Sequence, residues 1–518
     1  MLHPRGSPLT DTLAALLATA PPDAPAIGAP DRIWLSFAGL AARTRATLAA
    51  LHGAGIGRGD RVAIVLPNGP EMASAFISIT QGAVAAPLNP AYTQDEFDFY
   101  LTDLKARAIL LPDGYKGPAL AAAQRQGLVV LRLTFDASDP AGKCTLTAEV
   151  NTGVTPDTTR SGPGDIALIL HTSGTTSRPK IVPLLQRNVA ASARHIGTAL
   201  ALTPADRCLN VMPLFHIHGL IAALAASLAA GASVCCAPGF DAVRFFGWLG
   251  AVRPSWYTAV PTMHQTLLQR APRNAQIIAR APLRFIRSSS ASLPAQVMLE
   301  LAATFNAPVI EAYGMTEAAH QMASNPLPPR AQKPGSVGVA AGPQIRIADE
   351  GADRLADGST GEVVISGPNV TPGYEGNPDA NARAFFQAEG RRWFRTGDQG
   401  ALDDEGYLTL TGRLKEIINR GGEKISPLEV DGILMDHPAV QQVVTFAMPH
   451  AKLGEDVAAA VVLRDGVAAD EAALRAFAAS RLAAFKVPRR IVILAEIPKG
   501  ATGKLQRIGL AQKLGLCP

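Results

Sequence analysis

Residues 171–180 read His171-Thr172-Ser173-Gly174-Thr175-Thr176-Ser177-Arg178-Pro179-Lys180 and follow directly on an apolar run, Ile166–Leu170. The apolar run is typical of a buried strand. Gly174 tolerates a positive φ angle, and small hydroxyl residues leave backbone N–H groups open, so the segment can curve around an anion. Lys180 adds a positive charge for a phosphate group. We therefore expect a polyphosphate-binding loop, although a Ser/Thr-rich segment of this kind also occurs in exposed turns.

The composition is that of a large globular protein. At 518 residues the chain exceeds one ordinary core, and 47% of it is hydrophobic against 18% charged. The net charge of +5 is small, without the Lys/Arg runs that bind nucleic acid. Five cysteines without a CxxC spacing argue against a disulfide framework or a zinc site. Met1–Ala20 lacks the apolar core of a signal peptide. We expect a cytoplasmic protein of two or more domains, a monomer or homodimer, with small anionic ligands and no nucleic acid.

One uncharged segment, Gly219–Phe240, is long enough to cross a membrane. It is rich in Ala, Ser and Gly, Gly231 interrupts it, and Ser233–Ala237 has the pattern of a short strand. We expect a buried helix followed by a buried strand, and no membrane insertion.

Strand and helix patterns alternate on both sides of a patternless connection, Asp136–Pro163. This alternation indicates an α/β fold with parallel sheets covered by helices. The strands expected are Trp34–Phe37, Arg61–Leu66, Val84–Pro87, Ala108–Leu111, Ile166–Leu170, Leu209–Met212, Ser233–Ala237, Trp256–Val260, Leu283–Ser288 and Pro308–Tyr313. The helices expected are Asp11–Ala20, Leu40–His52, Glu71–Gly82, Thr93–Asp103, Asn188–Ala201 and Pro294–Phe305.

The pattern changes twice after residue 330. Short strand patterns separated by Gly, Pro and Asp run from residue 334 to 411 and predict a small β-barrel or sheet unit. Beyond Arg413 the pattern is that of a compact α+β unit. We place a boundary near Gly412–Lys415, so that residues 1–412 form a large N-terminal domain and 413–518 a small C-terminal one.

Four further segments carry candidate chemistry, and each alone also fits an ordinary turn or surface loop. The small residues Ser288–Ala291 follow a strand and permit close approach of a ligand. In Glu311–Glu317, Tyr313 offers a ring for a base, and Thr316 and Glu317 offer oxygen ligands for Mg²⁺. Asp398 can accept both hydroxyls of a ribose. Lys504 lies in a glycine-containing segment near the C-terminus.

In chain order, six segments of this sequence resemble the adenylate-forming superfamily of acyl-CoA synthetases, peptide-synthetase adenylation domains and luciferases. They are residues 171–180, Glu311–Glu317, Thr396–Asp398, Gly412–Lys415, Arg420–Pro427 and Gly503-Lys504. The resemblance runs from near Asp23 to near Leu510. It implies a large N-terminal domain of two αβ-layered sheets plus a small β-barrel. It also implies a small, mobile α+β C-terminal domain that rotates between two half-reactions.

The resemblance also implies roles for individual residues, with ATP and coenzyme A as substrates and Mg²⁺ as cofactor. Those expected around the phosphates of ATP are Thr172, Ser173, Gly174, Thr175, Thr176, Lys180 and Thr316, with Glu317 and Thr175 at the metal. Those expected around adenosine are Ser290, Ala291, Glu311, Ala312, Tyr313, Asp398 and Arg413. In the C-terminal domain they are the hinge Lys415, the coenzyme A contacts Gly422 and Lys424, and the catalytic Lys504.

The acid pocket in this superfamily would be lined here by polar groups, His216, His218, Ser290 and His320. Three imidazoles and a hydroxyl suit a short polar acid better than a fatty acid, although a histidine can also serve only in packing. Residues 215–219, 256–262, 285–293 and 316–326 are similar to the oxalate–CoA ligases. That subgroup implies oxalate contacts at Ser290, His320 and one of His216 or His218, with His216 also a catalytic candidate.

The sequence departs from that subgroup at a few positions. Gly314 stands where alanine is frequent, Ile181 where glycine is usual and Gly500 where threonine is usual, and Ser177 replaces a glycine common in the wider superfamily. No implied catalytic group is lost. We expect an ATP-dependent oxalate–CoA ligase that acts through an acyl-adenylate. The alternatives are a CoA ligase for another short-chain or aromatic acid, an enzyme that loads a carrier protein, and a non-enzymatic binding protein of the same fold.

Overall fold

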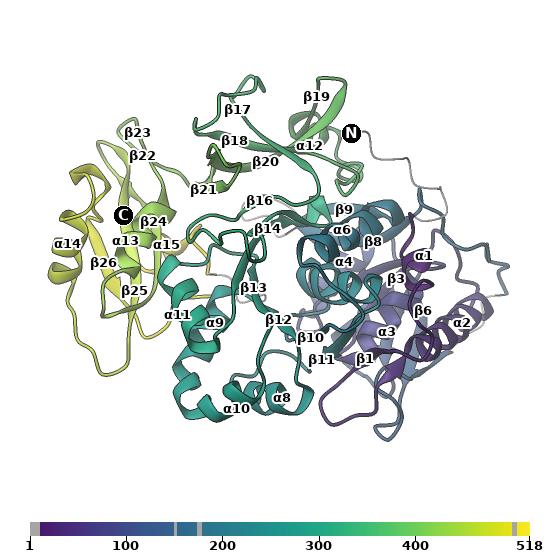
Figure 1. Cartoon of the computed structure of the whole chain (residues 1–518). Coiled ribbons are helices and arrows are strands. Elements are labelled where there is room, and N and C mark those ends of the chain that lie inside the picture. The colour runs from purple at the N-terminus through teal and green to yellow at the C-terminus, as the bar shows by residue number, and fades with distance from the viewer. Residues whose placement is uncertain (1–10, 150–152, 173–178, 500–504, 518) are drawn as a thin grey trace.

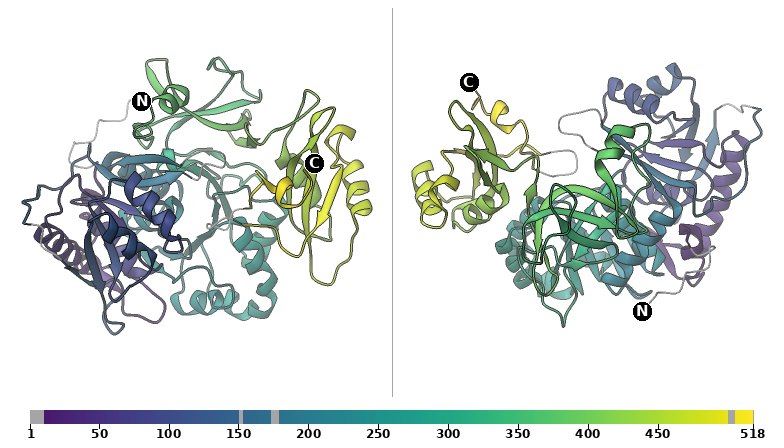
Figure 2. Two further views of the ribbon diagram at one scale, coloured as in Figure 1. Left: turned by 180° about the vertical axis from the view of Figure 1, so that it is seen from behind. Right: turned by 90° about the horizontal axis from the view of Figure 1, so that it is seen from above.

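The structure, a computed structural model, describes residues 11–149, 153–172, 179–499 and 505–517. It contains two large sheets, a smaller antiparallel sheet and a C-terminal α+β domain. In Figures 1 and 2 the small sheet lies over the two large ones, and the C-terminal domain lies beside the second large sheet. The α/β class and the division into a large N-terminal and a smaller C-terminal domain are confirmed.

The first large sheet has seven strands in the order β7-β6-β5-β3-β4-β8-β9. Its inner strands are parallel, as the alternating pattern predicts, and antiparallel pairs close both edges. Its strands are β3 (Arg61–Ile64), β4 (Val84–Pro87), β5 (Ala108–Pro112), β6 (Val129–Thr134), β7 (Thr145–Ala148), β8 (Ile166–Thr172) and β9 (Lys180–Leu185). The helices of this part of the chain are α1 (Leu13–Leu17), α2 (Phe37–Gly53), α3 (Pro70–Ile79), α4 (Gln94–Asp103) and α5 (Pro118–Arg125).

The second large sheet has nine strands in the order β16-β15-β14-β13-β12-β10-β11-β1-β2. Its strands are β1 (Pro25–Gly28), β2 (Leu35–Ser36), β10 (Arg207–Asn210), β11 (Ser233–Cys236), β12 (Trp256–Ala259), β13 (Phe285–Ser289), β14 (Val309–Met315), β15 (His320–Ser324) and β16 (Val339–Ala340). The α-helices here are α6 (Gln186–Ala199), α7 (Ala226–Ala229), α8 (Phe245–Val252), α9 (Pro261–Arg270), α10 (Ala275–Arg280) and α11 (Ala295–Phe305). A π-helix, η2 (His218–Ala225), precedes α7, and the short 3₁₀ turns are η3 (Ala271–Asn274) and η4 (Thr316–Ala318).

The connection Asp136–Pro163 does not separate the two sheets. β1 and β2, near the N-terminus, join the second sheet, whereas β8 and β9, beyond the connection, complete the first. The connection also holds β7, which pairs with β6. Strand partners lie far apart in sequence here, and periodicity does not reveal them.

The uncharged segment Gly219–Phe240 is a buried helix and a buried strand, as predicted. It comprises most of η2, then α7 and β11, and nearly all of its first part is fully buried. Gly219 is needed at the start, because a Cβ there would lie 2.4 Å from the Pro213 carbonyl oxygen. Within the described ranges no helix is long and apolar enough to cross a bilayer.

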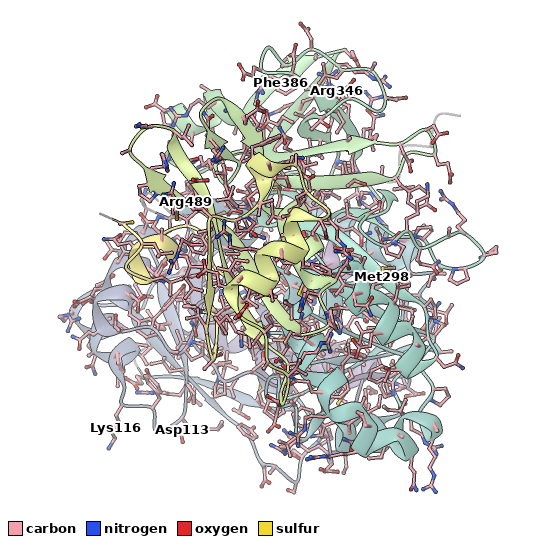
Figure 3. The ribbon with its side chains drawn as sticks, turned by 90° about the vertical axis from the view of Figure 1, so that its left-hand side faces the viewer. Asp113, Lys116, Met298, Arg346, Phe386 and Arg489 are labelled. Atoms are coloured by element: carbon pink, nitrogen blue, oxygen red, sulfur yellow. The ribbon has the colours of Figure 1, made fainter. Side chains whose placement is uncertain are left out.

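The third sheet is an open antiparallel sheet of five strands in which β20 pairs with β18, β19 and β21. The strand pairing is therefore that of a sheet unit, one of the two forms the sequence left open, and no ladder among the described residues closes it into a barrel. Its elements are β17 (Gln344–Ala348), β18 (Gly361–Ser366), α12 (Pro378–Ala384), β19 (Phe385–Ala388), β20 (Arg391–Leu402) and β21 (Leu408–Arg413). At its outer end the Arg346 guanidinium lies 5.5 Å from the centroid of the Phe386 ring (Figure 3).

The C-terminal domain is built on a five-stranded sheet with helices and follows β21 after four residues. Its elements are β22 (Ile418–Arg420), β23 (Glu423–Ile425), α13 (Pro427–Met435), β24 (Val440–His450), β25 (Gly454–Leu463), α14 (Glu471–Ala479), η5 (Ala484–Lys486), β26 (Arg490–Ile493) and α15 (Leu510–Lys513). It lies beside α9 and α11 in Figure 1, and Gln265 of α9 donates a hydrogen bond to the Gln441 carbonyl at 3.0 Å.

Candidate active site

The β8–β9 hairpin carries the loop from which the sequence argument began. Thr172 and Lys180 are directly opposite partners in its ladder, so the two ends of the loop are held together. The loop residues Ser173, Gly174, Thr175 and Thr176 lie outside the described residues, as does Lys504. β9 itself was not predicted.

Lys180 lies above an aromatic ring that sequence reasoning did not single out. Its ammonium nitrogen is 4.3 Å from the centroid of the Tyr374 ring. Burial lowers the pKa of Lys180, and Lys415 and Arg383 lower it further, while Glu317 acts in the opposite direction. The implied hinge residue Lys415 is therefore close enough to Lys180 to act on its charge. The local field there is positive, which suits a polyanion.

Glu317 is a buried carboxylate in the η4 turn that follows β14. Its Oε1 accepts a hydrogen bond from the Tyr374 hydroxyl at 2.9 Å, and its backbone carbonyl accepts one from the Thr371 N–H at 2.7 Å. Burial raises the pKa of Glu317, and the Tyr374 hydrogen bond and the nearby cations oppose that rise. Thr316 precedes it, partly exposed, so both predicted oxygen donors lie at the end of β14.

Asp398, Tyr313 and Arg413 meet where the small sheet approaches the second large sheet. The Tyr313 hydroxyl donates a short hydrogen bond to Asp398 Oδ2, and Arg413 Nε is 3.3 Å from Asp398 Oδ1. Asp398 and Arg413 are direct ladder partners on β20 and β21. Asp398 raises the pKa of Arg413, which therefore stays charged. The structure brings together three residues that the sequence assigned to adenosine.

The remaining residues expected around adenosine lie within β14 and just beyond the carboxyl end of β13, its parallel neighbour. Glu311 Oε1 accepts the Leu293 backbone N–H at 2.8 Å, and burial raises the pKa of Glu311 to about 8. The Ser289 hydroxyl donates to the Ala312 carbonyl at 2.7 Å. Ser290 follows with φ of 76°, and Ala291 is exposed beyond it. Strand ends of this kind are where open α/β sheets bind ligands.

His218 is the centre of the acid-side cluster. Its Nδ1 is 3.0 Å from Ser290 Oγ, and its Nε2 is 2.6 Å from Thr258 Oγ1. The ring of His320 lies with its centroid 5.1 Å from that of His218. His216, which is partly exposed, accepts the backbone N–H of His218 at its Nδ1, at 3.3 Å. The structure thus gathers the four residues predicted for the acid pocket around one imidazole.

The coenzyme A candidates lie apart from this cluster. Gly422 and Lys424 are exposed on the β22–β23 hairpin of the C-terminal domain. Gly422 has φ of 99°, which favours glycine. Both residues implied for coenzyme A therefore lie on a surface hairpin, in a different sheet from the His218 cluster.

Three further residues were missed from the sequence: Tyr374, Thr258 and Arg287. The side chain of Arg287 is fully buried, and it donates to His218 Nε2 at 3.3 Å and to Gln321 Oε1 at 3.4 Å. A signal for Arg287 was present, because it is a charged residue within a predicted strand, Leu283–Ser288. Tyr374 and Thr258 gave no comparable signal, since an aromatic or a hydroxyl residue is ordinary in their contexts.

The sequence matches two family profiles. The AMP-binding enzyme family matches residues 16–375, and the AMP-binding enzyme C-terminal domain matches residues 429–504. The chain is 44% identical to an oxalate–CoA ligase of Arabidopsis thaliana, covering 97% of this chain and 98% of that one. It is 43% identical to an oxalate–CoA ligase of Saccharomyces cerevisiae, covering 89% of this chain and 88% of that one.

Solved structures agree with this fold. ATP-bound MatB from Rhodopseudomonas palustris superimposes with a TM-score of 0.87 at 30% identity, covering 97% of this chain and 98% of that one. A benzoate–CoA ligase from Burkholderia xenovorans LB400 superimposes with a TM-score of 0.83 at 26% identity, covering 96% and 99%. Profile, relatives and fold lead to one conclusion: the chain belongs to the AMP-binding enzyme family and is an AMP-forming acid–CoA ligase.

Proposed function

We propose that this enzyme converts oxalate, ATP and coenzyme A to oxalyl-CoA, AMP and diphosphate. The observation that supports the proposal is the cluster of His218, Ser290 and His320. These hydrogen-bonding groups suit a short polar acid, whereas a fatty acid needs an apolar pocket. The near full-length similarity to two oxalate–CoA ligases supports the same acid.

In the first half-reaction a carboxylate oxygen attacks the α-phosphorus of ATP. The new O–P bond forms as the bond to the β-phosphate breaks, and diphosphate leaves. Two anions must approach each other, so catalysis depends on positioning and charge neutralisation. Lys180 and the loop before it hold the leaving diphosphate, Thr316 the α-phosphate, and Asp398 with Arg413 the ribose. Lys504 stabilises the charge that develops at the α-phosphate.

The residues present fit a Mg²⁺ ion bound together with ATP. Mg²⁺ is usually held by one or two carboxylates and substrate phosphates, and Glu317 is a buried carboxylate beside Lys180. Thr175 is the second predicted ligand. When bound, the ion neutralises charge on the phosphate oxygens. The Tyr374 hydrogen bond orients Glu317 for this role.

In the second half-reaction the coenzyme A thiolate attacks the acyl carbon of the adenylate, and AMP leaves. Lys504 is not needed there. We propose that residues 413–518 rotate about Lys415 relative to residues 1–412, withdrawing Lys504 and bringing Gly422 and Lys424 to the pantetheine. Lys415 lies two residues after the end of β21, in the four-residue link between the two sheets, and this position supports the role. Such gating is common where one site serves two steps.

A second candidate substrate is another short acid with two negative charges. A sulfoacetate–CoA ligase of Cupriavidus necator is 35% identical over 96% of this chain and 97% of that one. The polar cluster around His218 suits such an acid, and it gives an aromatic acid little apolar contact. A non-enzymatic role is not favoured, because Glu317, Asp398 and Arg413 retain their mutual arrangement.

The setting of the enzyme is also a proposal. We infer a cytoplasmic monomer or homodimer. All five cysteines are free thiols, and four of them are buried, which suits a reducing compartment.

The test is diphosphate release with a panel of acids, with and without coenzyme A. We expect release with oxalate, weaker or no release with sulfoacetate and benzoate, and none with a fatty acid. In Lys504→Ala, diphosphate release should fall by several orders of magnitude, while thioester formation from supplied oxalyl-adenylate persists. Turnover of fatty acids without oxalate would overturn the substrate, and full adenylation in Lys504→Ala would overturn the role of the lysine.

A further inference from the structure

Arg287 is a buried cation that the adenylation chemistry does not use. It lies on β13 with its side chain fully buried between that sheet and η2. Two of its nitrogens make long hydrogen bonds, to His218 and Gln321, and its Nε has no partner among the described residues. A buried charge normally has a counter-ion that repays the cost of removing it from water.

No such counter-ion is present in the part of the chain that the structure describes. Burial lowers the pKa of Arg287 to about 9, and the one group that opposes this is the Cys208 thiol, not a carboxylate. Glu311 is on the neighbouring strand, but its register partner is Ser288, so it projects from the other face of the sheet. The positive charge of Arg287 is therefore uncompensated, and its guanidinium faces His218.

The hydrogen bonds of His218 connect this charge to the acid pocket. A guanidinium can only donate, so the N–H of Arg287 fixes a lone pair on His218 Nε2. The Thr258 hydroxyl donates to the same nitrogen. Nδ1 then carries the hydrogen and donates it to Ser290 Oγ. The hydroxyl hydrogen of Ser290 is left to donate in another direction, toward a bound acid.

We propose that Arg287 determines specificity for a doubly charged acid, by supplying the missing counter-charge for the carboxylate that does not react and by orienting Ser290 through His218. The proposal rests on the function proposed above. Arg287 acts through His218 and is a positioning residue. In the free enzyme its buried charge is a cost, and an acid with a second negative group beside His218 offsets that cost, whereas a singly charged acid does not.

The experiment compares oxalate with glycolate, which keeps one carboxylate and replaces the other by a neutral hydroxymethyl group. The ratio of kcat/KM for the two acids is measured in the wild type, in Arg287→Met and in Arg287→Lys. Arg280→Met, an exposed arginine at the end of α10, controls for the change in net charge. Thermal unfolding of each variant reports whether it is folded.

We expect Arg287→Met to lower the oxalate-to-glycolate ratio between about 10- and 100-fold, the range of one charge-assisted interaction. Most of the loss should appear in KM for oxalate, with KM for ATP unchanged. Arg287→Lys should recover part of the ratio because it keeps the charge, and Arg280→Met should not change it. A general structural defect would instead lower kcat/KM equally for both acids and would also change KM for ATP.

The outcomes separate the two proposals. Wild-type turnover of oxalate with an unchanged ratio in a folded Arg287→Met overturns the role of Arg287 and leaves the function intact. If the wild type uses sulfoacetate and not oxalate, the proposed function is wrong, and sulfoacetate against propionate then tests Arg287 in the same way. If Arg287→Met does not fold, equal loss for both acids in Arg287→Lys overturns the role. A wild type that uses no doubly charged acid overturns both.

Discussion

Gly314 on β14 lies directly against the backbone of His320 on β15. A Cβ atom built on Gly314 would be 1.9 Å from the His320 carbonyl oxygen and 3.1 Å from its Nδ1. The ladder between the two strands shifts register at this point. His320, with φ of 97°, occupies its position beside His218 because residue 314 has no side chain.

Gly314→Ala should therefore displace His320 and weaken binding of the acid. Overpacking of this kind costs about 1–3 kcal/mol, and we expect KM for oxalate to rise several-fold with little change in KM for ATP. Steady-state kinetics checks this, with Gly53→Ala, where a Cβ meets open space, as the control. Unchanged oxalate kinetics in Gly314→Ala would show that β15 adjusts to the added Cβ without cost.

Tyr374→Phe should make the enzyme more sensitive to acid. The Tyr374 hydroxyl donates to Glu317 and lowers its pKa, which burial raises. Without that donor the pKa rises further, so Glu317 loses its charge at a higher pH and binds Mg²⁺ less well. We expect the acid limb of the kcat/KM profile to move to higher pH and the Mg²⁺ requirement to increase.

The matched control is Tyr407→Phe, which removes a hydroxyl that donates to the Ala331 carbonyl at 2.8 Å, away from Glu317. It should leave both readouts unchanged. Identical pH profiles for Tyr374→Phe and the wild type would argue against Glu317 as the metal-binding carboxylate.

Glu311→Gln should remove a pH-dependent loss of stability. The pKa of Glu311 is about 8 in the fold against an ordinary 4.5, so the folded state holds a proton that the unfolded state releases. The free energy of unfolding therefore falls as pH rises from about 4.5 through 8. Glutamine resembles the protonated acid and should flatten this fall.

Denaturant unfolding at several pH values measures the effect. At pH 4 both proteins should be about equally stable, and above pH 8 the variant should be the more stable by several kcal/mol. Parallel curves for the two proteins would show that Glu311 is ionised in the fold.

Asp398→Asn should weaken ATP binding and spare the acid. Asp398 accepts a hydrogen bond from the Tyr313 hydroxyl and lies beside Arg413. A carboxylate can accept hydrogen bonds from both ribose hydroxyls, whereas an amide has only one accepting oxygen. We expect KM for ATP to rise about 10- to 100-fold, the size of one hydrogen bond to a charged group. Asp403→Asn, in the loop after β20, is the control. A rise in KM for oxalate alone would contradict the ribose assignment.

Most helices and strands with strong periodicity were predictable from the sequence, including the buried helix and strand that run from Gly219 to the end of β11. Strand partners were not, because β1 and β8 join sheets through contacts far apart in sequence. β9 was missed because Pro183 interrupts it. The first of the short strands predicted within residues 334–411 is reduced to β16, which starts only after Gly338 with its φ of 83°.

The site shows the same division. Asp398, Arg413, Glu317 and His218 were identifiable because their segments occur in a recognisable order. The charge of Arg287 within a strand is visible in the sequence, but its role is not, because that role depends on the residues its side chain contacts in the fold. Its partners His218 and Gln321 are 69 and 34 residues away in sequence.

The most direct measurement is product stoichiometry with purified enzyme, oxalate, ATP, Mg²⁺ and coenzyme A. Mass spectrometry should detect oxalyl-CoA, with one AMP and one diphosphate formed for each thioester and no ADP. Absence of oxalate-dependent AMP, or formation of ADP and phosphate in its place, would contradict the proposed reaction.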